Sequence, residues 1–380
     1  MLQNIPHLEL RTKLLRKRGV LALCLAWLLM GVACASQITR EPDILPNYLV
    51  IGVVGELRYK LPGWNDYQPV SLGTFLPSDT VIQSAENGEL DVLCLDLSVV
   101  HISANYHGGI SCSKSATILI RNSSPVVTPR REIIVVADIP YVTSPRHTFI
   151  RTPYPKISWA PTGDADTVYT VRLLNQNSNW HFDTTQLEMQ YPEDAPQLQP
   201  LVPYKIEITD SGSLSSTEEK TAMDLGFVLL PAEKISELDQ QLEQVEQMNL
   251  DSFATSLIES VILASYEVRN DAIFALNELI QKNSRTPAIM LQLGNLYMEV
   301  GLYQEAIHVY NDAYLAYQDI HDKAGQAAAQ FGMGAAYSNQ GKVVDAKEHL
   351  NLALTLFEEL NHHQGSAEAE ALLRQINSVP

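Results

Sequence analysis

Four cysteines are the side chains whose possible chemistry is clearest in this 380-residue sequence. Two of them, Cys94 and Cys112, lie in the β-type runs DVLCLDLSVV and GGISCSKSATILI, on either side of the turn-like ANYHGG. Neighbouring strands could bring their Cβ atoms to the roughly 3.5–4.5 Å that a disulfide needs. We expect this bridge in an oxidising compartment; two buried free thiols are the alternative, typical of a reducing one.

Other groups that could bind a metal or catalyse a reaction are isolated. His362 and His363 adjoin in NHHQG, but neighbours on a helix point in different directions, which favours a surface helix end over a metal pair. Asp164 and Asp166 in TGDADT lack the acidic twelfth position of a calcium loop and are interpreted as turn formers. The motifs HExxH, G-x-S-x-G, GxxxxGK[ST] and paired CxxC do not occur. We therefore expect no cofactor, no metal and no enzyme, while a catalytic triad dispersed along the sequence stays open.

The first 35 residues have the three parts of a secretory signal peptide. An apolar run from Val20 to Val32 follows a basic stretch and precedes the small residues of GVACAS. The basic stretch consists of Arg11, Lys13, Arg16, Lys17 and Arg18. The run is shorter than the about 20 apolar residues that span a bilayer comfortably, so we expect export without a permanent transmembrane helix.

Two processing sites compete in this segment. Ala33-Cys34-Ala35 fits the small-x-small rule for release after Ala35, whereas Gly31-Val32-Ala33-Cys34 resembles a bacterial lipobox with Cys34 as the lipidated first residue. A retained signal anchor is a third possibility. We therefore expect an exported protein of the periplasm or cell surface, with a membrane attachment only through a lipid on Cys34 or a retained anchor.

The charge excludes two classes of partner. Removal of residues 1–35 takes away five of the 26 Lys and Arg residues and one of the 44 Asp and Glu residues, so the net charge moves from −18 to about −22. Nucleic acids and anionic lipid surfaces both require basic patches, so neither is an expected partner. Solubility alone can account for this charge.

Short β runs broken by turns occupy the segment after a tether at residues 36–47. Gly55-Glu56-Leu57, then LGTFLPSDTVI from Leu72 to Ile82, then NGELDVLCLDLS from Asn87 to Ser98 follow one another. This arrangement resembles the FecR-like family of extracytoplasmic β domains. The resemblance implies a small all-β domain at residues 48–125. The cytoplasmic region that lets iron-signalling members bind a sigma factor has no counterpart in the short stretch before the apolar run, so direct sigma regulation is not expected.

A second β segment at residues 132–230 is richer in proline. The run VYTVRLL alternates Tyr169, Val171 and Leu173, YKIEIT alternates Tyr204, Ile206 and Ile208, and KISWAP places Trp159 in a strand. Alternation with a period of two and a buried tryptophan suggests a β-sandwich of the fibronectin or immunoglobulin kind. The stretch SGSLSSTEEK is interpreted as a loop before a closing strand in LGFVLL.

The sequence pattern predicts helices from Pro231 to the end of the sequence, because apolar residues recur there at intervals of three and four. Small and aromatic residues then repeat at fixed offsets, first around LGNLYMEVGLYQEAIHVYNDA and again forty residues later. The repeating residues are Ala272, Gly294, Tyr297, Gly301, Ala306, Tyr310, Ala313, Gly334, Tyr337, Gly341, Ala346, Leu350 and Ala353. The pattern resembles the tetratricopeptide repeat in two copies, with Ala272 marking a degenerate earlier copy, and implies an α-solenoid at residues 231–380.

The resemblance implies that such an array binds a peptide or protein in a groove lined by the first helix of each repeat. We call eight residues the predicted groove residues: Leu291, Asn295, Met298, Glu299, Phe331, Ala335, Ser338 and Asn339. Small glycines and alanines are expected to let the two helices of a repeat approach closely, and SAEAEALLRQINS is expected to form a capping helix. Each of the eight could equally be an ordinary helix position, because binding energy concentrates in few residues.

These observations favour a multidomain β and α protein that acts as an interaction scaffold of the cell envelope, not as a catalyst. A FecR-like sensor or regulator is the first alternative, and a retained transmembrane helix would favour it. A cell-wall or glycan-binding protein is the second, with Trp64 and Trp180 as the candidate exposed aromatics.

Overall fold

A computed structural model describes residues 48–112, 139–162, 166–175, 178–218, 226–282 and 286–378, with no account of the side chains of residues 178 and 179. They belong to one unit that runs from Pro46 to Pro380. The signal peptide, the tether, the lipidation candidate Cys34 and the turn former Asp164 lie outside the described residues.

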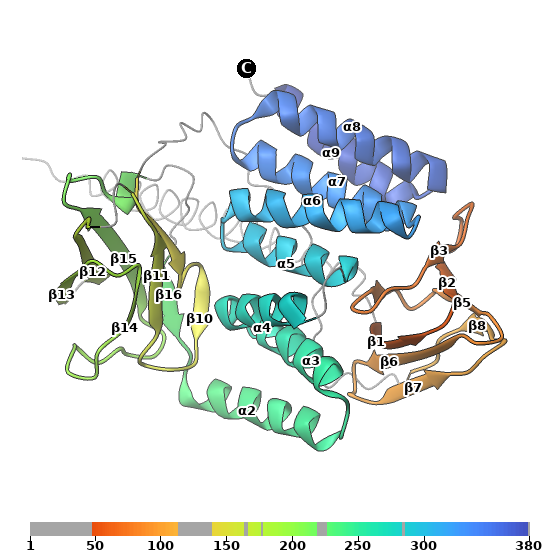
Figure 1. The fold of residues 1–380 in the computed structure, drawn as a ribbon, viewed down its shortest axis with the longest axis horizontal. Coiled ribbons are helices and arrows are strands. Elements are labelled where there is room, and N and C mark those ends of the chain that lie inside the picture. The colour runs from red at the N-terminus through yellow and green to blue at the C-terminus, as the bar shows by residue number, and fades with distance from the viewer. Residues whose placement is uncertain are drawn as a thin grey trace, which may run out of the picture. The chain divides into compact units, whose positions relative to one another are not determined.

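Eight strands form the first β module, which we define as residues 48–112 (Figure 1). They are β1 (Tyr48–Val54), β2 (Leu57–Lys60), β3 (Gln68–Pro69), β4 (Phe75–Leu76), β5 (Val81–Ser84), β6 (Glu89–Cys94), β7 (Val99–Ile102) and β8 (His107–Gly109). Two antiparallel sheets have the orders β4-β1-β6-β7 and β3-β2-β5-β8. In β2 the side chains of Leu57 and Tyr59 are buried and that of Arg58 is exposed, because successive residues of a strand face opposite sides of the sheet.

Eight more strands form the second β module, which we define as residues 139–230. They are β9 (Tyr141–Ser144), β10 (Thr148–Ile150), β11 (Lys156–Ala160), β12 (Tyr169–Asn175), β13 (Ser178–Thr184), β14 (Glu188–Gln190), β15 (Pro203–Asp210) and β16 (Phe227–Leu229), with the 3-10 helix η1 at Ser216–Glu218. A five-stranded sheet has the order β10-β16-β15-β12-β13, and a three-stranded sheet has the order β14-β11-β9.

The alternation predicted for this module is confirmed. Tyr169, Val171 and Leu173 of β12 share one core with Trp159, which is 3% exposed, and the predicted inward residues of β15 join them. The predicted closing strand is β16, which pairs with the start of β15 in antiparallel fashion and with β10 in parallel fashion. Residues 211–218 of the predicted loop follow β15, and residues 219 and 220 lie outside the described part.

Eight helices are described after the second β module. They are α2 (Ala232–Gln247), α3 (Ser252–Ser265), α4 (Arg269–Lys282), α5 (Pro287–Glu299), α6 (Tyr303–Asp319), α7 (Lys323–Asn339), α8 (Val343–Leu360) and α9 (His363–Ser378). Figure 1 shows α3 to α8 stacked in chain order, and α8 also contacts α9. The helices α3 and α4, α5 and α6, and α7 and α8 make three pairs, which we call repeats 1, 2 and 3, and α9 follows as the expected capping helix.

Close helix contact within a repeat depends on glycine, as the sequence predicted. A Cβ atom added to Gly294 of α5 would lie 2.5 Å from Cε1 of Tyr310 in α6. A Cβ atom added to Gly334, forty residues later, would lie 2.6 Å from Cγ of Leu350 in α8. Real Cβ atoms do not approach so closely, so each glycine makes room for the large side chain of its partner helix.

Gly301 and Gly341 serve a different purpose from the one predicted. Their backbone φ angles are +74° and +73°, so they form the left-handed turn between the two helices of repeats 2 and 3. Gly341 is exposed and Gly301 is half-buried. Their glycine identity therefore follows from backbone conformation and not from helix packing.

Repeat 1 follows the same plan with other residues. Ser260 and Leu263 of α3 stand where repeat 2 has Gly294 and Tyr297, and both are buried. Glu267 has a φ angle of +59° at the place of Gly301. In repeat 1, a small serine and a left-handed glutamate thus provide the geometry that two glycines provide in repeat 2. Ala272 is fully buried, as predicted.

Candidate functional site

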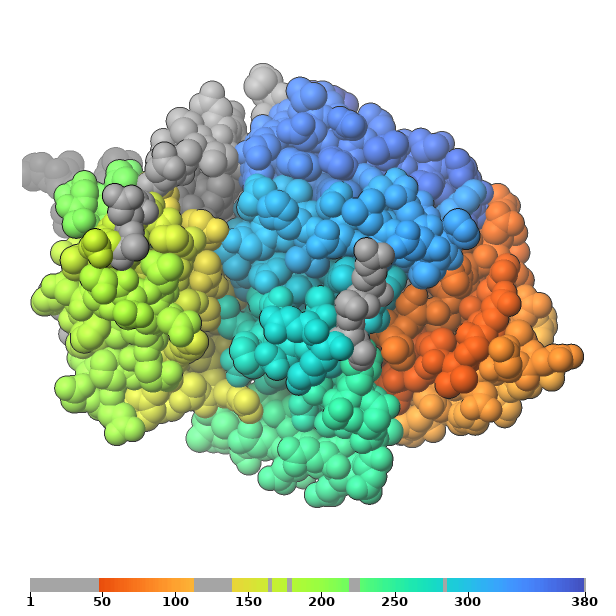
Figure 2. Space-filling model, in the orientation of Figure 1, coloured from red at the N-terminus to blue at the C-terminus, as the bar shows by residue number. Residues whose placement is uncertain are grey.

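The predicted groove residues lie on α5 and α7, the first helices of repeats 2 and 3. Their side chains are not equally accessible. Four are buried, namely Asn295, Met298, Ala335 and Asn339. Four are half-buried, namely Leu291, Glu299, Phe331 and Ser338. No predicted groove residue is fully exposed, and Figure 2 shows how closely the side chains over α5, α6 and α7 pack.

Several of these residues have partners inside the array. The Oδ1 atom of Asn295 accepts a hydrogen bond of 2.7 Å from the hydroxyl group of Tyr310, and burial raises the pKa of that hydroxyl well above its usual value. The carboxylate of Glu299 pairs with Nε of Arg269 at 2.7 Å. In this structure these two residues hold helices together, and among the eight a partner could reach only the half-buried members.

The first β module contacts the turns that precede α7 and α9. The backbone N–H of Asn65 donates to the carbonyl of Leu360 at 2.9 Å, and its side-chain amide donates to the carbonyl of Glu359 at 3.0 Å. The backbone N–H of Lys323 donates to Oε1 of Gln68 at 2.8 Å. These contacts place the module over the turn between α6 and α7 and the turn between α8 and α9.

Two titratable side chains cap helices beneath this module. Asp322 accepts from the backbone N–H of Gly325 at 2.9 Å at the start of α7, and His362 accepts through Nδ1 from Gly365 at 2.9 Å at the start of α9. The two positions are forty residues apart and therefore equivalent in the repeat. Burial raises the pKa of Asp322 to about 7 and lowers the pKa of His362. Each side chain caps its helix best when it is unprotonated, because it then accepts the hydrogen bond from the backbone N–H.

The predicted helix end is confirmed, because α9 begins at His363, but His362 is half-buried and not a surface residue. Its ring packs 5.2 Å from Trp64 and 5.1 Å from Phe357, measured between ring centres. Trp64 itself is only 6% exposed, so it belongs to this contact and not to an exposed aromatic surface. His363 is exposed, as expected.

The second β module contacts the C-terminal end of α5 through a buried arginine. Arg146 is 0% exposed, and its guanidinium donates to the carbonyls of Val300 at 2.6 Å, Gly301 at 3.2 Å and Val142 at 3.1 Å. The first two carbonyls end α5, where the helix dipole is negative, so a cation is favoured there. This side chain fastens the module to the turn of repeat 2.

Neighbouring residues of the same segment fasten the module to the turn of repeat 1. The backbone N–H of Phe149 donates to the carbonyl of Glu267 at 2.9 Å, and the hydroxyl of Thr148 donates to the same carbonyl at 3.1 Å. The backbone N–H of Arg146 donates to Oδ1 of Asn270 at 3.1 Å. Sequence reasoning missed this segment, because an arginine is normally expected at the surface.

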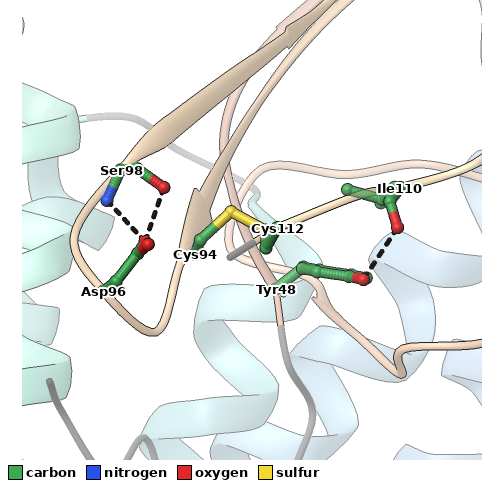
Figure 3. Close-up of a disulfide and its surroundings, with 6 residues drawn as sticks. All are labelled: Tyr48, Cys94, Asp96, Ser98, Ile110 and Cys112. Atoms are coloured by element: carbon green, nitrogen blue, oxygen red, sulfur yellow. Dashed lines mark hydrogen bonds between the residues drawn. A yellow bond between two sulfur atoms is a disulfide. The ribbon is translucent and has the colours of Figure 1, made fainter. Parts of the chain in front are cut away.

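A disulfide joins Cys94 and Cys112, whose Cα atoms are 5.8 Å apart (Figure 3). The expectation that neighbouring strands bring them together is wrong. Cys94 ends β6, which pairs with β1 and β7, whereas Cys112 follows β8, which pairs with β5 in the other sheet. The bridge therefore connects the two sheets of the first β module, beside the hydrogen bond of 2.8 Å from the Tyr48 hydroxyl to the carbonyl of Ile110.

The described ranges contain neither a cluster of metal-binding side chains nor a membrane-spanning helix. No group of three or more His, Cys, Asp or Glu side chains among these residues could hold a metal ion. No helix in the same part of the chain is long and apolar enough to cross a bilayer.

Comparison with known proteins assigns part of the helical array to a family. Residues 285–359, which hold repeats 2 and 3, match the family described as "Tetratricopeptide repeat". A comparison with curated proteins gives no match. The described helices α5 to α8 are therefore a tetratricopeptide-repeat segment, as the residue offsets predicted.

Two solved structures are similar to part of the chain. The first is titled "Crystal structure of PcrH in complex with the chaperone binding region of PopD"; it is 19% identical, covers 37% of this chain and 93% of its own, and has a TM-score of 0.29. The second is titled "MamA MSR-1 C2"; it is 16% identical, covers 38% of this chain and 88% of its own, and has a TM-score of 0.28.

Proposed function

We propose that this protein is a non-catalytic scaffold that binds another protein or a peptide through its tetratricopeptide-repeat segment. The observation that carries the proposal is the family match over residues 285–359 together with the three helix pairs. Stacked repeats create extended concave surfaces, and such a surface can contact a peptide or a protein along its length.

The half-buried predicted groove residues Leu291, Glu299, Phe331 and Ser338 are the proposed contact positions. Phe331 packs beside two hydrophobic clusters of the array, so a partner side chain placed over it would gain further apolar burial. Apart from Arg269, which pairs with Glu299, few basic residues flank these positions, which favours shape and apolar contact over charge as the basis of binding.

The proposed location is the cell envelope, after export, with Cys34 lipidated or Ser36 as the first residue. The order of basic, apolar and small residues in the first 35 positions supports export. A disulfide between Cys94 and Cys112 is also consistent with an oxidising compartment. We expect mass spectrometry of native material to find the N-terminus at one of these two residues, and an intact Met1 would contradict the proposal.

We further propose that the first β module is FecR-like and that the second is a fibronectin- or immunoglobulin-like sandwich. Two four-stranded antiparallel sheets support the first assignment, and a buried tryptophan between two sheets supports the second. A role as an extracytoplasmic sensor is the alternative function, and retention of the apolar N-terminal segment would favour it. Trp64 is buried and cannot serve as an exposed aromatic, so the glycan-binding alternative depends on Trp180 alone.

Crosslinking and pull-down from the native envelope would test the scaffold proposal. The bait is the mature chain, and the matched variant is Phe331→Ala. We expect Phe331→Ala to weaken capture of the main partner while helical content by circular dichroism stays unchanged. Equal capture by both baits, or no specific partner at all, would contradict the proposal, and unfolding of the variant would assign Phe331 to the core.

A further inference from the structure

The turns between the two helices of each repeat line one side of the array. We define them as the first turn (residues 267–271), the second turn (residues 301–305) and the third turn (residues 341–345). Each begins with a left-handed residue, namely Glu267, Gly301 or Gly341. The three turns are therefore equivalent in backbone geometry, although they differ in what covers them.

One segment of the second β module, residues 144–150, covers the first two turns. Its Phe149 and Thr148 donate to the Glu267 carbonyl of the first turn, and its Arg146 donates to the Gly301 carbonyl of the second. As a result no residue of the first turn is exposed, and only Gln304 of the second is exposed. We call residues 144–150 the docking segment.

The third turn continues this interface but is open. All five of its residues are exposed, including Val343 at 41% and Val344 at 79%. Val344 stands at the place of Asn270 in the first turn, whose side chain and backbone both contact the docking segment. Beside the turn, Gln340 is only 9% exposed and its buried Oε1 atom finds no donor among the described residues.

We propose that the third turn binds an extended segment of a partner protein that carries an arginine and apolar residues three and four positions after it, as the docking segment does with Arg146, Phe149 and Ile150. The guanidinium would lie at the C-terminal end of α7, where the helix dipole favours a cation. The apolar residues would cover Val343 and Val344. This site lies at the turns, whereas the proposed groove lies on the faces of α5 and α7.

The charges beside the turn are compatible with this occupant. The Lys342 ammonium lies 5.6 Å from the ring centre of Tyr337, so it has an aromatic partner, and Asp345 follows it in the first turn of α8. The carboxylate of Asp345 is exposed and offers an anion to an incoming arginine.

A labelled peptide with the sequence of residues 141–151, YVTSPRHTFIR, is the probe for this site. Fluorescence anisotropy would measure its binding to the full chain. We expect saturable binding below about 1 mM, and a loss of about tenfold when the peptide arginine at the place of Arg146 becomes alanine, since a charge-assisted hydrogen bond contributes about that much. Absence of binding up to that concentration would overturn the proposal.

Protein variants separate the third turn from other sites. Val344→Asp is expected to weaken peptide binding at least about fivefold without changing the melting temperature, because the side chain is mostly exposed. Val54→Asp, at another exposed valine, and Phe331→Ala in the groove should leave peptide affinity unchanged. If Val344→Asp leaves the peptide affinity unchanged, the peptide has displaced the docking segment instead of binding the third turn, and the proposal is overturned.

A second copy of the chain is the other occupant to test. Sedimentation equilibrium of the full chain without peptide is expected to show no self-association that depends on the third turn. A dimer that Val344→Asp dissociates would assign the turn to self-association, which would also overturn the proposal. Since Phe331→Ala tests the groove alone, failure of this proposal and failure of the scaffold proposal are distinguishable.

Discussion

Replacement of Arg146 by methionine would test whether the second β module is fastened to the array as the structure indicates. Methionine keeps a long apolar side chain but removes the charge and the guanidinium hydrogen bonds to the carbonyls of Val300, Gly301 and Val142. A buried carbonyl left without its donor costs about 1–3 kcal/mol. Because the guanidinium serves three carbonyls and relaxation recovers part of the loss, we expect the free energy of unfolding to fall by about 3 kcal/mol, a large share of the about 5–15 kcal/mol of a folded domain.

Urea denaturation followed by tryptophan fluorescence and circular dichroism measures this change, and a thermal scan should show a drop of about 5–10 °C. Arg374→Met is the matched control, because Arg374 lies on α9 with its side chain 68% exposed and, among the described residues, pairs with Glu370 alone. Exposed ion pairs contribute at most about 1 kcal/mol, so this variant should behave almost as the natural protein does. Equal losses in the two variants would refute the assigned role of Arg146.

Three further perturbations have defined outcomes. Reduction of the Cys94–Cys112 disulfide should lower the stability of the first β module by about 3 kcal/mol, as measured by denaturation with and without reductant; an unchanged midpoint would show that the sheets hold together without it. Gly334→Ala should cost about 1–3 kcal/mol through overlap with Leu350, and the cost should shrink in a Leu350→Ala background; the same cost in both backgrounds would exclude that overlap. The carboxyl of Asp322 keeps its proton up to a pKa of about 7 when folded and loses it near 3.8 when unfolded, so it favours folding at low pH and loses this effect as pH rises between these values. The melting temperature of Asp322→Asn should therefore rise relative to that of the natural protein as the pH increases from about 4 to about 7. A difference between the two melting temperatures that does not vary with pH would contradict the burial of this carboxyl.

The sequence predicted those features that depend on local repetition. Small residues recur at fixed offsets because each repeat must solve the same packing problem, so Gly294 and Gly334 could be identified without a structure. Alternation in β12 and β15 likewise predicted which side chains face the core. The pair Cys94 and Cys112 could be matched by elimination, but not assigned to two different sheets, because strand order depends on contacts remote in sequence.

Contacts between modules could not be predicted, since no local pattern marks them. Arg146 lies 154 residues from Val300, and a charged side chain in a turn is normally taken as exposed. The sequence pattern of repeat 1 was difficult to recognise for a related reason. Glu267 adopts the left-handed conformation that glycine supplies in the other repeats, because the carbonyl of this residue is held by Phe149 and Thr148 of the second β module. A tertiary contact thus replaces a local preference.

The placement of the two β modules bears on how the array can act as a scaffold. In a plain solenoid each repeat contacts only its neighbours, so the ends fray and the spacing of successive helices can vary. Here the second module bridges the turns of repeats 1 and 2, and the first module bridges α5, α7 and α8 through Gln292, Lys323 and Leu360. These bridges couple repeats that one-dimensional stacking leaves independent. The proposed binding surface on α5 and α7 would therefore be held in place before a partner arrives, which would lower the conformational entropy lost on binding.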